Sequence, residues 1–310
     1  MDIMWREICA AATAFVVLFW NVECFFDPFD DPLKDDDEFT SGAVRHWTWP
    51  RFEKKRDGIA QTILSVSDWT GELPAIVGLA EVENRLVVSQ LVRKTLLDEL
   101  GYAYVHRESP DVRGIDVALL YRKDCLHLLA VDSLRVPGVV TRDILYVTFD
   151  TPGQARGDAA DDTGGLLHVF VAHLPSKLGG ARASQGRRDA AQRVLERAVD
   201  SLLQLDAESR ILVMGDFNDT DKRVSGLSAP LFDGEPAAPG TLKFHGRWEQ
   251  IDAFFVSTAL KEARMQIFAP PFLMENDAAY LGTKPRRTYI GPRYNGGLSD
   301  HLPITLKIFY

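Results

Sequence analysis

Carboxylate, amide and imidazole side chains recur in this sequence at points where an apolar run is interrupted or ends. The set comprises Asn21, Glu23, Glu81, His173, Asp216, Asn218, Asp252, Asp300 and His301. Such apolar runs predict buried strands, so we expect their polar ends to lie on the rim of a sheet. If these rims converge, the carboxylates can hold a divalent metal and the two histidines can transfer protons.

Residues 211–219, Ile-Leu-Val-Met-Gly-Asp-Phe-Asn-Asp, show this pattern most clearly. The four apolar residues predict a short buried strand, and Gly215 is expected to end it in a tight turn that projects Asp216 and Asn218. A carboxylate and an amide oxygen suit Mg²⁺, which proteins usually hold with one or two carboxylates, waters and a substrate phosphate. Because Asp and Asn are also ordinary turn residues, this segment alone leaves a simple turn open.

The composition is that of a soluble globular protein. The 310 residues are 46% hydrophobic and 25% charged, which allows a sizeable core and excludes disordered and collagen-like classes. A net charge of −9 argues against binding nucleic acid by bulk electrostatics, although a local basic rim remains open. The three cysteines, Cys9, Cys24 and Cys125, are widely spaced and predict free thiols instead of a disulfide framework.

The N-terminus has two interpretations. Residues 8–20 are apolar, but these 13 residues are too few to span a bilayer, so we expect no stable membrane insertion. Residues 12–14, Ala-Thr-Ala, resemble the cleavage site of a degenerate export signal, whereas the alternative is a first core strand with a short leader. The second interpretation, and with it a cytoplasmic location, is preferred, and export to the periplasm or medium stays open.

Hydrophobic periodicity predicts a regular series of strands and helices along the chain. Helices are expected at 51–68, from an Asn84 cap to about Leu100, and at 181–205. Strands are expected at 15–26, 74–80, 102–106, 115–121, 126–136, 144–149, 166–172, 211–214, 250–257 and 302–309. This order predicts a four-layered α/β sandwich, two packed mixed β-sheets flanked by helices, in one domain that spans 1–310 with its core from about residue 14.

Three longer connections lie between these elements. Residues 27–50 form an acidic stretch that predicts a solvated loop, with a calcium site as the alternative. Residues 151–165 predict a hairpin loop, and residues 225–240 a loop rich in Gly, Pro and Ser.

Six motifs in this order resemble the endonuclease/exonuclease/phosphatase family, the relatives of deoxyribonuclease I and exonuclease III. They are Asn21-Val-Glu, Gly78-Leu-Ala-Glu81-Val-Glu-Asn, His173-Leu-Pro-Ser-Lys, Gly215-Asp-Phe-Asn218, Ile251-Asp252 and Ser299-Asp-His301-Leu-Pro. The resemblance extends from about Ala14 to Tyr310, and residues 109–121 are similar to the form found in bacterial members.

The resemblance implies a divalent-metal-dependent phosphoesterase with a deoxyribonuclease I-like fold. By motif, Glu81 is implied as the metal ligand, with Asn21 and Asp300 near the metal. Asp216 and Asn218 are implied to position the attacking water and the phosphate oxygens. The remaining implied catalytic residues are His301, held by Asp252, and His173, which faces the leaving-group oxygen.

The chemistry of phosphate ester hydrolysis is compatible with these roles. The reaction needs charge neutralisation on the non-bridging oxygens, an oriented water and protonation of the leaving oxygen. Mg²⁺ is the expected cofactor, with Mn²⁺ and Ca²⁺ as alternatives. A carboxylate beside His301 would raise the pKa of the imidazole and fix its tautomer.

Candidate substrate contacts come from basic residues near these motifs. Residues 284–294, which include Arg287 and Arg293, interleave cations with aromatic rings, as in a phosphate-binding or base-stacking rim. A solvated loop is the alternative for this segment. Arg113, Arg142 and Lys177 are further candidates for phosphate contact.

The preferred hypothesis is a metal-dependent phosphodiesterase, an endonuclease or exonuclease, that acts on nucleic acid as a monomer. A phosphomonoesterase, or a phosphodiesterase for a lipid or another small molecule, is the alternative within the same fold. A non-catalytic binding module is a third hypothesis, which the presence of every catalytic residue type disfavours.

Overall fold

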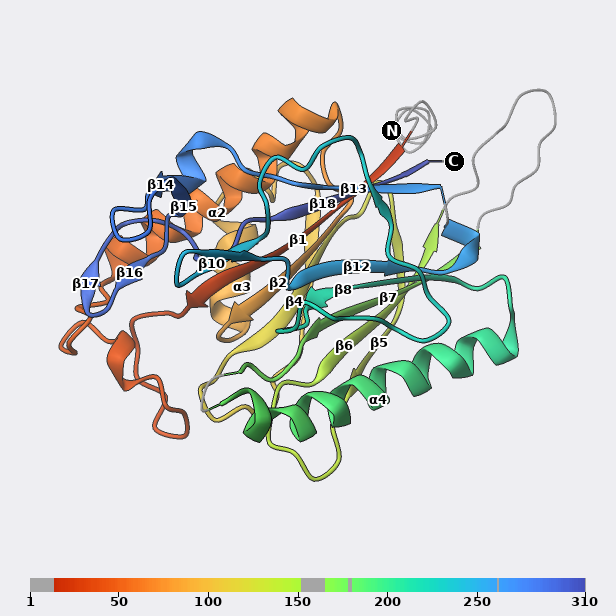
Figure 1. Ribbon diagram of the computed structural model, residues 1–310, viewed down its shortest axis with the longest axis horizontal. Helices are drawn as coiled ribbons and strands as arrows, with labels where there is room; N and C mark the ends of the chain where they lie inside the picture. Colours follow the sequence, from red (N-terminus) through yellow and green to blue (C-terminus); the bar gives the residue numbers. More distant parts are fainter. Residues whose placement is uncertain (1–13, 152–164, 178–179, 261, 310) are drawn as a thin grey trace.

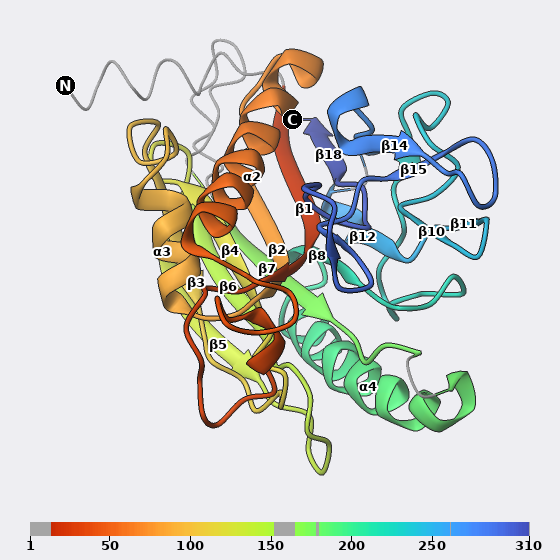
Figure 2. The same cartoon turned by 90° about the vertical axis from the view of Figure 1, so that its left-hand side faces the viewer.

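Two mixed β-sheets lie face to face at the centre of the molecule, with helices on both outer sides (Figure 1). The computed structural model describes residues 14–151, 165–177, 180–260 and 262–309. Helices α2 (Trp49–Thr70) and α3 (Arg85–Arg93) cover one sheet, and α4 (Ala181–Leu205) covers the other, as Figure 2 shows from the side. This is the predicted four-layered α/β sandwich.

The first sheet has seven strands. In spatial order they are β3 (Tyr102–His106), β4 (Asp116–Arg122), β2 (Ile76–Val82), β1 (Ala14–Phe25), β18 (Ile304–Phe309), β13 (Ala263–Ile267) and β9 (Leu231–Phe232). The second sheet has five strands. They are β12 (Asp252–Val256), β8 (Arg210–Asp216), β7 (Gly165–His173), β6 (Ile144–Thr151) and β5 (His127–Leu134).

The remaining described elements are short. Three two-stranded hairpins are formed by β10 (Leu242–Phe244) with β11 (Arg247–Glu249), β14 (Met274–Asn276) with β15 (Thr283–Pro285), and β16 (Tyr289–Ile290) with β17 (Arg293–Tyr294). Single 3₁₀ turns are η1 (Asp37–Phe39), η2 (Thr258–Leu260) and η3 (Pro271–Leu273). Among the described residues, no helix is both long and apolar enough to cross a membrane.

Strand directions bring several distant segments to one edge of the sandwich. β1 runs parallel to β2, and β7 runs parallel to β8, so the carboxyl ends of each pair lie together. β18 and β12 run antiparallel to β1 and β8, which places their beginnings at the same edge. The polar residues at these ends and beginnings therefore meet, as the sequence predicted.

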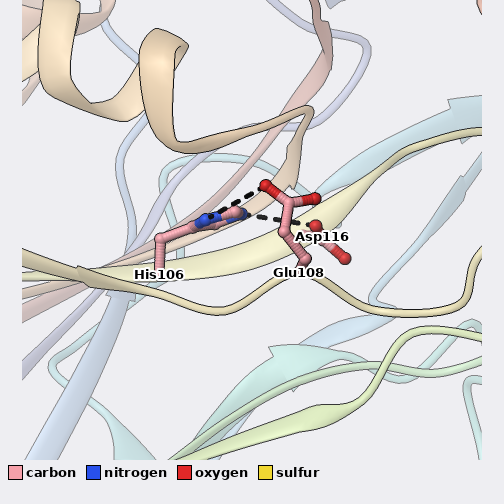
Figure 3. A group of neighbouring side chains, drawn as sticks. All are labelled: His106, Glu108 and Asp116. Carbon is pink, nitrogen blue, oxygen red and sulfur yellow. Dashed lines mark ion pairs between the residues drawn. The ribbon is translucent and has the colours of Figure 1, made fainter. Parts of the chain in front are cut away.

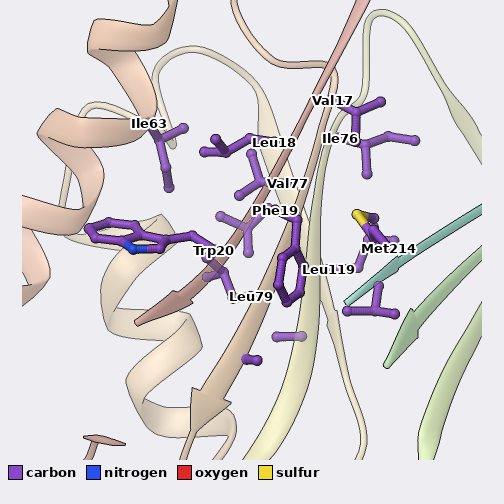
Figure 4. Packing of buried hydrophobic residues seen from close by; sticks show 14 of the residues in the cluster. Val17, Leu18, Phe19, Trp20, Ile63, Ile76, Val77, Leu79, Leu119 and Met214 are labelled. Atoms are coloured by element: carbon purple, nitrogen blue, oxygen red, sulfur yellow. The ribbon is translucent and has the colours of Figure 1, made fainter. Parts of the chain in front are cut away.

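The core explains why β1 is apolar at nearly every position. Leu18 and Trp20 point to α2 and pack near Ile63, whereas Phe19 points into the sandwich toward Met214 of β8 (Figure 4). A strand buried on both faces needs apolar residues on both, and each large side chain so buried contributes about 1.5–3 kcal/mol. The rigid sandwich holds the strand ends in place.

Most of the predicted elements are present, and α4 has the predicted bounds 181–205. The prediction for the second helix is wrong at its end, because α3 stops at Arg93 instead of Leu100. There the Thr95 hydroxyl donates to the Leu91 carbonyl at 2.6 Å and accepts from the Leu97 amide at 3.3 Å. Such side-chain bonds compete with helical backbone pairing.

Two further differences concern the sheets. Gly215 does not end β8, since it pairs with Ala172 inside the sheet and the strand continues to Asp216. Strand β13, which the sequence analysis did not predict, pairs with β18. The possible export signal falls mainly on residues 1–13, and the predicted hairpin loop on 152–164, so both lie outside the described residues.

Candidate active site

Six side chains from six different segments converge at the shared edge of the two sheets. They are Asn21 on β1, Glu81 on β2, His173 on β7, Asp216 on β8, Asp252 on β12 and His301 just before β18. In the second sheet, Asp216 pairs directly with both His173 and Asp252. All but Glu81 are buried, and the side chain of Glu81 is 16% exposed.

Two irregular strands aim Glu81 at this cluster. Register shifts interrupt β1 between Asn21 and Phe25, and β2 between Ala80 and Val82. Glu81 has a φ of 62°, and Cys24 has a φ of 50°, values that non-glycine residues adopt at a cost of about 1–3 kcal/mol. The two bulges interlock, because Glu81 Oε2 accepts from the Cys24 amide at 2.9 Å. Bulges of this kind redirect side chains, and here Glu81 Oε1 is left facing the other site residues.

Asp216 lies at the centre of the site. Its Oδ1 accepts from the Asn218 amide at 2.8 Å, while its Oδ2 lies 3.5 Å from His173 Nε2 and 3.9 Å from His301 Nε2. Burial, followed by the charge of Asp252, raises the pKa of Asp216 to about 7. The carboxylate therefore sits in surroundings where a cation or a donated proton stabilises it.

Asn21 links the carboxylates of Glu81 and Asp216. Its Nδ2 donates to Glu81 Oε1 at 3.3 Å and to Asp216 Oδ2 at 3.1 Å, while its Oδ1 accepts from the Glu23 amide at 3.0 Å. In this orientation the amide nitrogen faces the site. Asn21 thus holds the carboxylates together, and direct ligation of a metal by its oxygen would require the amide to turn.

The surroundings of the partly buried Glu81 favour its ionised form. Burial opposes its charge, but Arg113, the Cys24 amide and His301 outweigh that effect and hold the pKa of Glu81 below its usual value. Arg113 belongs to the loop between β3 and β4, so that loop supplies positive charge to the site.

His301 is held in one orientation by its neighbours. Its Nδ1 lies 2.8 Å from Asp252 Oδ2, and its carbonyl accepts from Trp20 Nε1 at 2.9 Å. Burial disfavours the imidazolium, but the charges of Asp252 and Asp216 prevail and hold the pKa of His301 well above its usual value. With Nδ1 engaged, Nε2 is the atom that His301 presents to the site.

His173 has the opposite electrostatic character. Burial, together with Arg142 and Arg113, holds the pKa of His173 well below its usual value, so the ring is neutral. Its Nε2 faces Asp216 and Glu81, and its buried Nδ1 has no hydrogen-bond partner among the described residues. A proton on Nε2 satisfies this arrangement, and a neutral imidazole that donates from Nε2 is suited to a developing oxyanion.

The donor set fits a divalent cation. The carboxylates of Asp216 and Asp252 have ligand atoms within 4.8 Å of each other and of a His301 ring nitrogen, and Glu81 Oε1 shares the Asn21 amide with Asp216. When bound, such a cation supplies positive charge for the non-bridging oxygens of a phosphate. Asp300, predicted near the metal, accepts from Arg287 Nη2 at 3.0 Å, and its place near a metal stays a prediction.

The predicted phosphate contacts differ in their surroundings. Arg142 is buried, and it donates to Asp111 Oδ2 at 3.1 Å and to the carbonyls of His173 and Leu174. These bonds place Arg142 behind the site, and its contact with phosphate stays a prediction. Arg113 lies in the loop between β3 and β4, 3.5 Å from Asp111 Oδ1, and its charge acts on Glu81.

The other three predicted contacts lie at the surface. Lys177 Nζ is 3.7 Å from Asp219 Oδ1, and Arg287 donates to both Glu23 and Asp300. Arg293 is exposed on the β16–β17 hairpin. Two of these three cations are therefore partly neutralised by neighbouring carboxylates.

The aromatic residues of 284–294 do not form an open stacking surface. Tyr289 is buried, and Arg45 lies over its ring at 5.1 Å to the centroid. Arg51 covers the ring of Tyr294 at 4.3 Å. The rings pack against cations from another part of the chain because the hairpin folds onto the start of α2.

Sequence reasoning missed a buried network behind this edge. Lys55 of α2 is buried and donates to the Glu23 carbonyl and to Thr288 Oγ1, and Glu23 Oε2 accepts from the Thr288 amide at 2.7 Å. Burial and Asp300 raise the pKa of Glu23 to about 7. The sequence contains one indication of this network. Lys55 lies four residues before the apolar Ile59, and this spacing places it on the core-facing side of the predicted helix.

A comparison with protein families identifies the family of this chain. The sequence matches the model of the Endonuclease/Exonuclease/phosphatase family over residues 16–232 and 229–309. The chain belongs to this family. Membership makes it a phosphoesterase, and the buried cluster of Asp216, Asp252 and His301 is consistent with a metal site of these enzymes. No curated protein matches the sequence.

Several solved structures share the fold. Truncated TDP2 from Caenorhabditis elegans is 16% identical, with a TM-score of 0.61 over 96% of this chain and 98% of that one. A mannosyl-6-phosphatase from Bacteroides thetaiotaomicron is 17% identical, with a TM-score of 0.60 over 95% and 100%. The catalytic domain of human Nocturnin is 18% identical, with a TM-score of 0.55 over 95% and 94%. At these identities the likeness establishes the fold.

Proposed function

We propose that this chain is a Mg²⁺-dependent phosphodiesterase that cleaves nucleic acid. The observation that carries the proposal is the set of groups gathered around Asp216 Oδ2. A second carboxylate, Glu81, is linked to it through Asn21. The charged ring of His301, held by Asp252, and the neutral ring of His173 face the same oxygen. This combination provides a cation site, a water-orienting base and two donors in one buried cluster. A binding module would not need all of them.

Each residue has a distinct part in the proposed reaction. Asp216 and Asn218 orient the attacking water and a phosphate oxygen, and Asp252 keeps His301 charged so that Nε2 donates to the phosphate. His173 stabilises the leaving oxygen by a hydrogen bond from Nε2, and Asp216, whose pKa is raised to about 7, accepts the proton of the attacking water. Proton transfer by a positioned side chain contributes about 10²–10⁴-fold to such a reaction.

The charges around the site favour a substrate held by few phosphates. Of the five predicted phosphate contacts, Arg142 is internal, and Lys177 and Arg287 already face carboxylates. Each phosphate contacted in a nucleic acid adds about 0.7–0.9 to the slope of log affinity against log salt. We therefore expect a shallow salt dependence and a preference for single strands or ends over long duplex DNA. Zebrafish TDP2, with a TM-score of 0.51, was crystallised with a single-strand DNA product, which supports this substrate class.

A phosphomonoesterase is the second candidate. The mannosyl-6-phosphatase named above matches this chain as well as TDP2 does, with TM-scores of 0.60 and 0.61. The cluster itself is compatible with either ester, because both reactions need the same charge neutralisation and leaving-group protonation. The two kinds of substrate would differ only in what they present to Arg287 and Arg293 at the rim of the site.

The test compares three substrates in parallel: a single-stranded oligonucleotide, bis-p-nitrophenyl phosphate and p-nitrophenyl phosphate. Each is assayed with Mg²⁺, with Mn²⁺ and with chelator. Metal-dependent cleavage of the oligonucleotide and the diester is the expected result. Cleavage of the monoester alone would assign the chain to the second candidate, and no turnover with either metal would refute both.

A further inference from the structure

We propose that His106, Glu108 and Asp116 form a zinc-binding site separate from the catalytic cluster. Figure 3 shows His106, at the end of β3, with its ring facing the carboxylates of Glu108 and Asp116. Asp116 begins β4 and pairs across the sheet with Val82, the residue after Glu81. The site therefore lies on the same edge of the sandwich as the catalytic residues but is built from other strands.

The distance between His106 and Asp116 is that of two ligands of one ion. His106 Nε2 lies 3.3 Å from Asp116 Oδ2. Two ligands bound about 2.0–2.2 Å from zinc at a tetrahedral angle are about 3.4 Å apart. The two atoms do not form a hydrogen bond, and neither has another hydrogen-bond partner among the described residues.

Burial makes these two atoms costly without a partner. The side chains of His106 and Asp116 are each 2% exposed. A buried polar atom that makes no hydrogen bond is destabilising, and a cation between the two atoms would satisfy both.

Glu108 supplies the third ligand from the solvent side. Its side chain is 59% exposed, and its Oε1 lies 3.8 Å from the other ring nitrogen, Nδ1 of His106. One ligand atom from each of the three residues lies within 4.8 Å of the other two. An exposed glutamate can close the remaining distance by rotating. One imidazole nitrogen with two carboxylates suits Zn²⁺ better than Mg²⁺ or Ca²⁺, which prefer oxygen ligands alone. Three protein ligands leave a fourth position for water.

The ion would fix the loop between β3 and β4, because its ligands stand at the two ends of that loop. Asp116 Oδ1 accepts from the Ser109 amide at 3.1 Å, which already draws the loop onto β4. Within the loop, Asp111 holds Arg142, and Arg113 acts on Glu81. The proposed zinc would therefore stabilise the segment that supplies positive charge to the catalytic cluster.

The experiment measures zinc bound per chain after metal removal and equilibrium dialysis against Zn²⁺. Because the catalytic cluster also has ligands for zinc, the count is made in the otherwise unchanged protein and in Asp216→Asn. His106→Ala is expected to lower the count by one in both backgrounds. His127→Ala removes an exposed histidine from β5 and serves as the matched control, with no expected change.

Two further readouts keep the proposal falsifiable if His106→Ala does not fold. Glu108→Gln changes only an exposed side chain and is expected to weaken zinc binding at this site by at least about tenfold. Co²⁺ bound there should show a visible absorption band that His106→Ala or Asp116→Asn removes. An unchanged zinc count in folded His106→Ala, or unchanged affinity in Glu108→Gln, would overturn the assignment.

Discussion

Replacing Gly215 by alanine should disturb both the sandwich and the catalytic pair beside it. A Cβ at position 215 would lie 2.3 Å from the carbonyl oxygen of Ala172 on the neighbouring strand β7. Real Cβ atoms almost never come closer than 3.0 Å, so the strands must separate by at least about 0.7 Å. The obstacle is backbone, which cannot move aside as a side chain can.

This displacement falls between two catalytic residues. His173 follows Ala172, Asp216 follows Gly215, and the two are paired across β7 and β8. Overpacking of this kind costs about 1–3 kcal/mol of stability. Since a misplacement of about 1 Å can cost 10²-fold in rate, Gly215→Ala should lower kcat by about 10- to 100-fold.

The assay measures kcat for bis-p-nitrophenyl phosphate and the free energy of unfolding in urea. Gly186→Ala in helix α4 is the matched control, because its Cβ would meet nothing within 4 Å. That control should keep full activity and gain about 0.5–1 kcal/mol from the better helix former. If Gly215→Ala is as active and as stable as the parent protein, the close approach of β7 and β8 does not position the site.

Three other predictions address separate parts of the molecule. Glu81→Gln should shift the Mg²⁺ titration of activity to higher concentration, and an unchanged titration would contradict its role as a ligand. Asn84→Ala should cost about 1 kcal/mol in urea unfolding, because the Asn84 side chain caps α3 by accepting from the Leu86 and Val87 amides, and a loss near zero would refute the cap. Burial lowers the pKa of His168, so the unfolded state binds its proton at higher pH than the folded state. The stabilisation relative to His168→Gln should be complete above about pH 6.5 and decrease as the pH falls below that value, and parallel curves from pH 7 to 5 would contradict this.

Much of the site could be predicted from the sequence because its residues end apolar strands. The strand of residues 211–216 is visible in its apolar run, and its partners carry the same signature. What those runs do not reveal is the reason for Gly215. The sequence suggested a turn, whereas the structure shows a close approach between two parallel strands, a tertiary contact that no local pattern encodes.

The β-bulges in β1 and β2 could not be predicted from the sequence either. Glu81 and Cys24 have a positive φ, although neither residue type favours that conformation. The strain is held by contacts between β1 and β2, residues far apart in the sequence. For the same reason the sequence could not show that Arg142, a predicted phosphate contact, is buried against Asp111 and two carbonyls.

The central claim is that the cluster around Asp216 cleaves phosphodiesters with the help of a divalent cation and His301. The most direct measurement is kcat for a phosphodiester with Mg²⁺ and with chelator, in the parent protein and in His301→Ala, with circular dichroism to verify folding. Turnover should require Mg²⁺, and His301→Ala should lose about 10²–10⁴-fold of it while remaining folded. Turnover that persists in chelator, or that survives in His301→Ala, would contradict the account.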